Sequence, residues 1–573
     1  MKSINNIIPK HLKRYIVTQD YSQYSEINQS TWRFIMKISI DFFKKHGHEI
    51  YLEGLNKTGI TLNKIPKISN INNKLSKFNW TAIPVRGFIP PNVFMEFQSL
   101  KILPIAADMR THKHLTYTPA PDIVHEAAGH APIIANKDYS NYLINYGEVA
   151  NKAIMSSEDM DLYYAIRALS DIKEKPNTSK NDIKNYNIKL KKAYQNITYT
   201  SESALLSRMN WWTVEYGLIG DLNNYKIYGA GLLSSVEESE NCLNNTIKKI
   251  PFSIDCINYK YDITEQQPQL FVTKNFKQLS KILRQLSNKM SYKIGGEYGL
   301  KEAIKAKTLC TIEIDHNIQV SGIVSSFISK NNVPIFIKTT GKTQLSFNKK
   351  ELKNHGVEYH INGYSCPIGK LKVYNKSIDT LSNDEIEKLN IKIDQTIKLE
   401  FLSGIKLIGT IKEINKKLSR IIIIKFNNCT VKYNSKILFK PDWGDFDLIC
   451  GESINSVYGG VADKLNYNKN EYKKLKYGHL NKKQSCNNSD LNKLHKQSKD
   501  LLRKYSDEKL LEIFNKAINQ YPNEWLILYE LLEISNINSS TEITNKIKKS
   551  FNKFINNKSP ESKVIKRGLD LIK

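Results

Sequence analysis

The sequence predicts a mostly α-helical first half at residues 1–300, a β-rich module at residues 305–450, and a linker with a C-terminal helical region at residues 451–573. Three observations support this order. Apolar side chains recur at helical spacing through much of the first half, strand-like alternation begins near Lys305, and helical spacing returns from about Asp490. A chain of 573 residues has room for about two to four domains, so units of different class are expected.

In the first half, helical segments alternate with turn-forming residues. The segment STWRFIMKISIDFF, from Ser30, places its apolar residues on one helical face, and Phe276 to Tyr292 repeats this pattern. Pro84 and Pro90 punctuate the loop VRGFIPPNVF. The other expected elements are helices between Met95 and Met160 broken by the loop RTHKHLTYTPAPD, a polar surface excursion at residues 173–192, a helix around SALLSRMNWWTVEYGL, and a Gly-rich turn at YGAGLLSS.

The second half begins with short alternating runs such as TIEIDHNIQVSGIVSSF and RIIIIKFNNCTVKYNS, which are typical of strands. GESINSVYGGVADKL, from Gly451, lacks the GKS or GKT of a phosphate-binding loop, so a turn between elements is expected. Farther on, QYPNEWLILYELLEI resembles one helix of a helical hairpin. A packing or oligomerisation role is expected for this half, because its aromatic residues are too sparse for an RNA-binding barrel.

The composition bounds the function further. The formal charge is +29, but lysine, asparagine and isoleucine are abundant along the whole chain, which favours a compositional bias over nucleic-acid binding. Seven scattered cysteines without a CxxC pair argue against a disulfide framework. The N-terminus lacks the apolar core of a signal peptide, and no apolar run approaches the roughly 18 residues that span a bilayer. A soluble cytoplasmic protein is expected, without membrane attachment.

The stretch PDIVHEAAGH carries the main chemical signal. It nearly spells H-E-x-x-H, the helical zinc motif of metalloproteases, but His125 and His130 are five residues apart. At about 100° per residue, five residues leave two side chains roughly 140° apart on an α-helix. Both imidazoles can therefore reach one ion only if the helix breaks or distorts, for which Gly129 and Pro132 are candidates. The spacing argues against protease geometry but not against a metal.

A third ligand candidate is Glu215, an ionisable residue in the otherwise apolar stretch NWWTVEYGL. Two histidines and a carboxylate with open positions describe the non-haem Fe(II) oxygenase site. Taken alone, such a residue is more often a structural glutamate with a satisfied partner than a metal ligand. A zinc hydrolase using His125, Glu126 and His130 is the alternative that these residues leave open.

Several segments together resemble a known family. They are STWRFI, YLEGLNKTGI, WTAIPVRGFIPPNVF, MRTHKHLTYTPAPDIVHEAAGHAP, NWWTVEYGLIG, YGAGLLSS and TEQQPQLFV. In order and spacing, over about residues 25–290, the chain resembles the pterin-dependent aromatic amino acid hydroxylases, most closely the bacterial phenylalanine hydroxylases. The resemblance implies a mostly helical, basket-like catalytic domain. It also implies Fe(II), a tetrahydrobiopterin-type cofactor and O₂ as co-substrate.

The resemblance also implies roles for individual residues. His125, His130 and Glu215 are expected to bind one Fe(II), with Glu126 beside the pterin. The remaining expectations are that the pterin stacks on Phe94 and contacts the backbone of Gly87 and Ile89, that Arg110 grips the substrate carboxylate, that Thr118, Trp211, Ser234 and Glu238 line the amino acid site, and that Glu126 and Trp211 take part in catalysis. His112 and His114 are expected to be solvent-exposed loop residues.

The expected reaction is ring hydroxylation of a free aromatic amino acid. Trp211 resembles members that act on phenylalanine or tyrosine, and similarity to bacterial members favours L-phenylalanine to L-tyrosine. Tyrosine or tryptophan hydroxylation is the alternative. Ala127 and Ala128 inside the metal motif, and Asn210 beside the tryptophan, depart from common family residues and affect the expected pocket shape. The second half could mediate oligomerisation.

Overall fold

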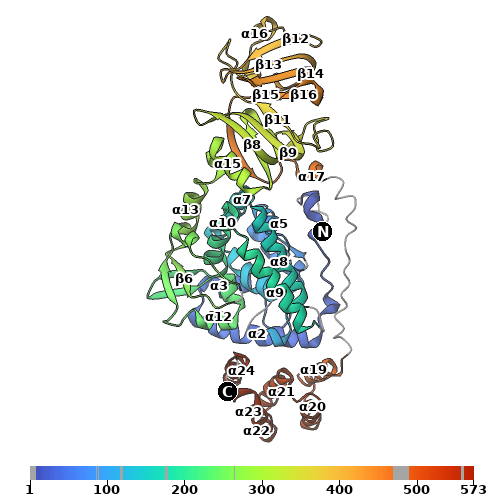
Figure 1. Ribbon diagram of the computed structural model, residues 1–573. Helices are drawn as coiled ribbons and strands as arrows, with labels where there is room; N and C mark the ends of the chain where they lie inside the picture. Colours follow the sequence, from blue (N-terminus) through green and yellow to red (C-terminus); the bar gives the residue numbers. More distant parts are fainter. Residues whose placement is uncertain are drawn as a thin grey trace.

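The computed structural model describes residues 8–85, 87, 89–115, 121–174, 178–263, 265–468, 489–556 and 560–572. Two β-sheets occupy one end of the molecule, a largely helical body lies in the middle, and the C-terminal helices lie at the other end (Figure 1). The expected order of a helical half, a β-rich part and a helical C-terminal part is therefore present. Within these described ranges, no helix is both long and apolar enough to cross a membrane.

The helical body is built around α2 (Glu26–His46). Ser25 and Asn28 form a reciprocal capping box that fixes its start, and its apolar face, including Trp32, is buried. The elements of the body are η1 (Lys10–Tyr15), η2 (Tyr21–Gln23), α2, α3 (Glu49–Thr58), α4 (Ile68–Leu75), η3 (Ser76–Phe78), β1 (Thr81–Val85), α5 (Pro91–Ser99), β2 (Ile102–Ala106), η4 (His112–His114), η5 (Val124–His130), α6 (Ala131–Ile134), α7 (Lys137–Ala150), α8 (Ser157–Glu174), α9 (Lys180–Gln195), α10 (Glu202–Asn210), η6 (Trp211–Glu215), β3 (Leu218–Asp221), β4 (Asn224–Ile227), α11 (Ala230–Ser234), α12 (Val236–Asn241), β5 (Lys248–Pro251), η7 (Ile254–Asn258), β6 (Gln269–Thr273), α13 (Phe276–Ser287), α14 (Ser291–Ile294) and α15 (Gly296–Ala306).

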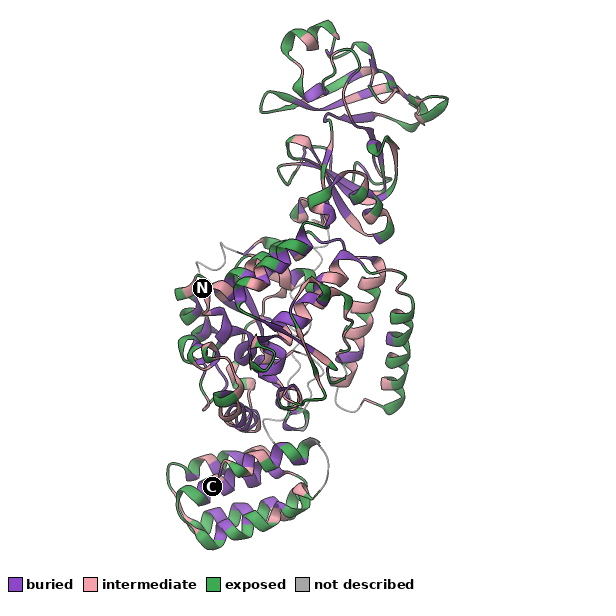
Figure 2. Cartoon of the chain, turned by 90° about the vertical axis from the view of Figure 1, so that its left-hand side faces the viewer, coloured by how far each residue is buried: buried purple, intermediate pink, exposed green. Residues whose placement is uncertain are grey.

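The body contains more regular structure than the sequence pattern predicts. β1 and β2 pair in parallel, and β4-β3-β6-β5 form a four-stranded sheet. The helical pattern of the sequence did not predict these strands. The segment YGAGLLSS was expected to be a turn, but it contains the buried helix α11. The polar segment at residues 173–192 runs into α9, which is exposed along most of its length (Figure 2).

The β-rich part consists of two sheets with one shared hydrophobic cluster. The first has the order β10-β9-β8-β7-β17, with β11 on β9, and the second has the order β12-β13-β14-β15, with β16 on β14. The elements are β7 (Leu309–Ile314), η8 (Asp315–Asn317), β8 (Ile318–Lys330), β9 (Val333–Phe347), β10 (Lys350–Glu351), β11 (Ser365–Pro367), η9 (Ile378–Thr380), α16 (Asn383–Lys388), β12 (Thr396–Glu400), β13 (Ile405–Lys417), β14 (Arg420–Tyr433), β15 (Lys436–Phe439), η10 (Pro441–Trp443), β16 (Phe446–Ile449), β17 (Ile454–Gly459) and α17 (Lys464–Tyr467).

The last strand of the first sheet lies beyond the expected end at residue 450. The glycine-containing segment from Gly451 was expected to be a turn but forms β17. This strand pairs with β7 at the edge of the first sheet, and it packs against α14 and α15 of the helical body. Gly459 passes so close to the body that a Cβ there would lie 2.4 Å from the carbonyl oxygen of Ala153. A larger residue would therefore separate the sheet from the body.

The C-terminal helices share the hydrophobic core of the helical body. Phe34 of α2 packs edge-on against Trp525 and Tyr529, with ring centroids 4.8 Å apart in both pairs. The C-terminal elements are α19 (Asp490–Leu501), α20 (Asp507–Gln520), α21 (Trp525–Ile537), α22 (Thr541–Ser550), α23 (Asn552–Ile555) and α24 (Pro560–Asp570).

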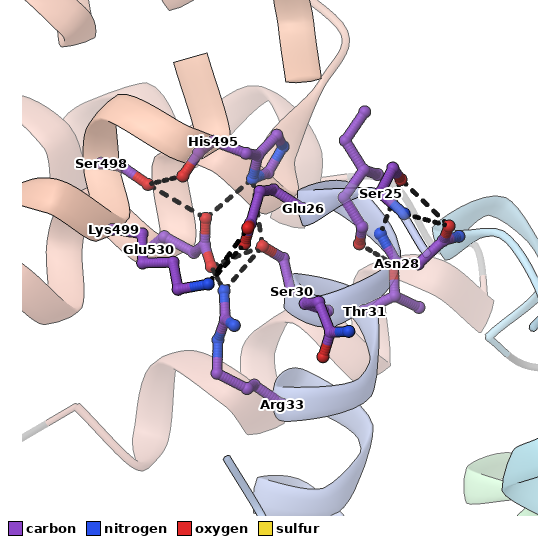
Figure 3. Close-up of polar contacts among 12 residues, drawn as sticks. Ser25, Glu26, Asn28, Ser30, Thr31, Arg33, His495, Ser498, Lys499 and Glu530 are labelled. Carbon is purple, nitrogen blue, oxygen red and sulfur yellow. Dashed lines mark hydrogen bonds and ion pairs between the residues drawn. The ribbon is translucent and has the colours of Figure 1, made fainter. Parts of the chain in front are cut away.

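A polar cluster around the buried Glu530 joins α2, α19 and α21 (Figure 3). Glu530 accepts hydrogen bonds from Arg33 and Ser30 of α2 and from Ser498 of α19, and one of its oxygens lies 2.7 Å from His495 Nδ1. Burial alone would raise the pKa of Glu530, but His495 and Arg33 outweigh it and hold the pKa at about 2. The carboxylate is therefore charged and paired at the junction between the body and the C-terminal helices.

Candidate functional site

A π-helical turn resolves the unusual histidine spacing. Residues Val124–His130 form η5, in which backbone hydrogen bonds run from residue i+5 to residue i, as from Ala131 N–H to the Glu126 carbonyl. This wider turn places residues five apart on one side of the helix, and the Nε2 atoms of His125 and His130 lie 3.2 Å apart. The expected distortion is present, but the helix does not break at Gly129 or Pro132.

Gly129 has a different role from the expected helix break. A Cβ at this position would lie 2.8 Å from the carbonyl oxygen of Ala230 in α11. Glycine therefore permits the close packing of η5 against α11. This contact brings the end of α11, with Ser234, next to His125.

A second π-turn carries Glu215. Residues Trp211–Glu215 form η6, closed by a 2.8 Å hydrogen bond from Tyr216 N–H to the Trp211 carbonyl. The carboxylate oxygens of Glu215 lie 3.5 Å from His125 Nε2 and 3.4 Å from His130 Nε2. Metal–ligand bonds of about 2.1 Å imply ligand atoms about 3.0 to 3.4 Å apart, so the three side chains fit around one first-row transition ion.

Charges in this cluster are set by burial and by mutual contact. Burial lowers the pKa of His125 to about 4, so its imidazole is neutral and its lone pair is available to a metal. Burial would also lower the pKa of His130 and raise that of Glu215. The attraction between these two residues outweighs burial, so the pKa of His130 is raised and that of Glu215 is lowered.

Ser234 fixes the orientation of His125. The Ser234 hydroxyl donates to the carbonyl of Ala230 at 2.8 Å, and its oxygen lies 2.9 Å from His125 Nδ1. Because the hydroxyl proton is used, Ser234 can only accept from Nδ1–H. This tautomer leaves the lone pair on Nε2, which faces His130 and Glu215.

Glu126 and Phe94 both lie near His130. Glu126 is buried, and its Oε2 lies 3.9 Å from His130 Nε2 without a hydrogen-bond partner among the described residues. Burial raises the pKa of Glu126 to about 8. The Phe94 ring centroid is 6.5 Å from that of His130. An unpaired buried carboxyl beside an aromatic ring suits a heterocycle with N–H donors, such as a pterin.

Gly87 and Ile89 lie on the segment that leads into α5 and Phe94. Gly87 has a φ of +59°, with no atom within 4 Å of a Cβ built there, and its N–H donates to Asp108 at 3.3 Å. Ile89 packs against a small hydrophobic cluster that includes Leu12. Among the described residues, neither Gly87 nor Ile89 contacts the histidine cluster.

Arg110 is held by Asp122, which the sequence analysis did not single out. The guanidinium donates to both Asp122 oxygens, at 2.8 and 2.7 Å, and to the Ser234 carbonyl at 3.0 Å. These bonds use three of the five guanidinium N–H groups, and the other two have no acceptor in the part of the chain that the structure describes. Asp122 precedes His125 by three residues within the same motif, which is the signal that could have identified it.

Trp211 and Glu238, two residues expected to line the amino acid site, are both connected to Gln267. The Trp211 ring stacks on Tyr216 and Tyr261, with centroids 4.6 and 4.4 Å away, and its Nε1–H donates to Gln267 at 3.1 Å. Burial, assisted by Glu237, raises the pKa of Glu238 to about 7, while a backbone hydrogen bond from Gln267 lowers it. Gln267 therefore connects Trp211 with Glu238. Thr118 lies outside the described residues.

The expectation for His112 is wrong. His112 is buried, and its Nε2 lies 2.6 Å from Glu524 at the start of α21, with its ring edge-on to Trp525. The C-terminal helices cover this side chain. Because they are far from His112 in the sequence, the sequence alone did not show that they bury it. His114 is exposed, as expected.

Comparison with known proteins finds a family match and relatives for the first half of the chain. Residues 11–199 and 193–309, together more than half of the chain, match the model of the biopterin-dependent aromatic amino acid hydroxylases. A phenylalanine-4-hydroxylase from Chromobacterium violaceum is 27% identical over 268 residues, which are 46% of this chain and 75% of that protein. One from Mesorhizobium japonicum is 26% identical over 266 residues, 46% of this chain and 80% of that protein.

A solved phenylalanine hydroxylase from C. violaceum, with bound iron(III) and 7,8-dihydrobiopterin, covers 49% of this chain and 94% of its own at 24% identity and a TM-score of 0.38. The family match ends at residue 309, where β7 begins. It includes the whole segment that carries the His125, His130 and Glu215 cluster. The resemblance stated from the sequence motifs is thus confirmed, and the chain belongs to the biopterin-dependent aromatic amino acid hydroxylase family.

Proposed function

We propose that this chain hydroxylates the ring of free L-phenylalanine to give L-tyrosine, using Fe(II), a reduced pterin of the tetrahydrobiopterin type and O₂. The observation that carries the proposal is the cluster of His125, His130 and Glu215, whose ligand atoms are 3.2 to 3.5 Å apart. Two imidazoles and one carboxylate are the ligand set of non-haem iron oxygenases with open coordination positions. Residues 1–300 would carry this chemistry.

In this proposal, His125, His130 and Glu215 hold the iron, while Phe94 and Glu126 border the pterin. When bound, the iron and the reduced pterin would together activate O₂. One oxygen atom would be transferred to the pterin and the other to the aromatic ring. The protein residues supply position and environment. Ser234 keeps the Nε2 lone pair of His125 directed at the metal position, and the buried surroundings limit access of water to the site.

Arg110 is the proposed partner of the substrate carboxylate. Asp122 holds the guanidinium in one orientation, and the two unused N–H groups match the two oxygens of a carboxylate. Trp211 and Glu238 would border the rest of the amino acid, with Thr118 and Ser234 completing its site. Gly87 and Ile89 would contact the pterin through their backbones.

The choice of phenylalanine is supported by two observations. Relatives that share 26 to 27% identity over about 46% of this chain are phenylalanine-4-hydroxylases. Trp211 also resembles members that act on phenylalanine or tyrosine. The alternatives are tyrosine and tryptophan, so the three amino acids are compared as substrates in one assay.

The test measures tyrosine formation by purified full-length chain with Fe(II), a tetrahydropterin and air. Wild-type chain is expected to turn over, and Glu215→Gln is expected to lose more than about a hundredfold in activity, because loss of a metal ligand exceeds the 10- to 100-fold effect typical of its supporting residues. Glu53→Gln is the matched control, since Glu53 is exposed and pairs only with Lys57.

Faster hydroxylation of tryptophan or tyrosine than of phenylalanine would overturn the substrate assignment but keep the reaction class. A chain that binds zinc and hydrolyses peptides without hydroxylating any aromatic amino acid would overturn the proposal in favour of the zinc hydrolase.

A further inference from the structure

A second cluster of metal-ligating side chains lies in the β-rich part, far along the sequence from the family match. His355 and His360 come from the segment between β10 and β11, and Asp447 comes from β16. One ligand atom from each of the three residues lies within 4.8 Å of the others. All three side chains are buried, with exposed fractions of 2, 6 and 5%.

The backbone holds both histidines in place. Leu345 N–H donates to the His355 carbonyl at 2.9 Å, and Thr343 N–H donates to the His360 carbonyl at 3.0 Å, so β9 fixes both ends of the histidine segment. The two imidazoles are nearly parallel, and His355 Nδ1 lies 3.3 Å from His360 Nε2. Two ring nitrogens therefore face each other at a separation that suits a shared ion.

Asp447 provides an unpaired acceptor at the same point. Its Oδ1 is buried and has no hydrogen-bond partner among the described residues. A buried carboxylate oxygen without a partner is costly, and such groups usually have a ligand, an ion or a proton to satisfy them. The main chain of Asp447 is fixed, because its carbonyl accepts a 2.8 Å hydrogen bond from the Tyr364 hydroxyl.

Charged side chains of both signs lie around the cluster. Lys425 is held over the ring of Tyr359 at 4.5 Å. Two further carboxylates, Asp445 and Glu413, lie close enough to Asp447 to act on it electrostatically.

We propose that His355, His360 and Asp447 bind one divalent transition metal ion of the zinc class. Imidazole and carboxylate suit such ions, and three protein ligands leave a fourth position for water. The histidines lie in the loop between two strands of the first β-sheet and Asp447 lies in a strand of the second, so the ion would join the two sheets where β11 and β16 are in contact (Figure 1). Such a site goes beyond the hydroxylase centre, which lies in the other half of the chain.

The test is a Zn²⁺ titration of the full-length chain after dialysis against a chelator, with bound metal measured by mass spectrometry. Asp447→Asn and His360→Gln are each expected to bind one equivalent fewer than wild type, whatever the hydroxylase centre retains. The matched control is His316→Gln, because His316 is a partly exposed histidine of the same β-rich part that pairs with Asp379. It is expected to bind as much as wild type. Equal stoichiometry in all four proteins would overturn the proposal.

A second measurement requires no substitution and is independent of how the variants fold. Crystals of the wild-type chain grown with Zn²⁺ are expected to give an anomalous difference peak, recorded at the zinc edge, between His355, His360 and Asp447. A map with zinc only beside Glu215, or with none in the β-rich part, would contradict the site.

Discussion

The Arg110 guanidinium and the Asp122 carboxylate form a two-pronged ion pair, with hydrogen bonds of 2.8 and 2.7 Å and side chains that are only 2 and 5% exposed. The pairing lowers the pKa of Asp122, since Arg110 outweighs the opposite effect of burial. Because the carboxylate also accepts from the backbone N–H groups of Arg110 and His125, it links the proposed substrate-binding arginine to the start of the metal-binding turn.

Replacing Asp122 by asparagine is expected to raise the KM for phenylalanine by about 10- to 100-fold. The change removes a charge-assisted pair worth about 1.5 to 3 kcal/mol and frees the guanidinium to rotate. Steady-state kinetics with the iron content measured in parallel tests this. Asp221→Asn, at the exposed end of β3, is the control. An unchanged KM at full iron loading would mean that Arg110 does not need Asp122 to bind substrate.

Ser234→Ala is expected to weaken iron binding or activity by about 10- to 100-fold. Without the hydroxyl, the Nδ1 of His125 loses its acceptor and the tautomer that directs Nε2 at the metal is no longer favoured. Iron affinity measured by competition with a chelator tests this. Ser239→Ala removes another buried hydroxyl, which donates only to a backbone carbonyl, and is expected to bind iron like wild type. Equal affinities in both variants would refute the role.

Phe94→Leu is expected to raise the KM for the tetrahydropterin by about two- to tenfold, because leucine keeps the apolar surface but loses the stacking of aromatic rings. The iron content should not change, since Phe94 contacts His130 only through ring packing at 6.5 Å. Phe42→Leu, on a different face of the body, controls for the loss of an aromatic ring. A pterin KM equal to wild type would remove Phe94 from the cofactor site.

Acid should release the C-terminal helices from α2. The pKa of Glu530 is held at about 2, below its ordinary value of 4.5, so its contribution is fully present above pH 4.5 and is lost as the pH falls toward 2. The shift corresponds to about 3 kcal/mol in total. Hydrogen-exchange protection of α21, corrected for intrinsic rates, should therefore fall through this pH window in wild type. Protection that falls equally in Glu530→Gln would show that another group is responsible.

The sequence motifs identified the family and placed His125, His130 and Glu215 together, although their roles stay predictions. Simple helical geometry showed that five-residue spacing requires a distorted helix. It could not distinguish a break from a π-turn, because the choice depends on packing of η5 against α11 and on backbone hydrogen bonds. Asp122 was passed over because a carboxylate at a helix start is common and its partner lies twelve residues away.

The second half was less predictable. Alternation identified its strands, but the pairing of β17 with β7 joins segments about 140 residues apart in sequence, which no local pattern encodes. The cluster of His355, His360 and Asp447 could not be predicted for the same reason, since only the contact between the two sheets brings these residues together. His112 was misjudged because the helix that covers it lies about 400 residues farther along the chain.

Isotope labelling tests the central claim most directly. The full-length chain is supplied with Fe(II), a tetrahydropterin and phenylalanine under ¹⁸O₂ in ordinary water, and the product is analysed by mass spectrometry. The expected product is tyrosine with one ¹⁸O atom in its hydroxyl group, and unlabelled tyrosine when the label is in the water instead. Tyrosine that takes its oxygen from water, or no hydroxylated product from any aromatic amino acid with iron bound, would contradict that claim.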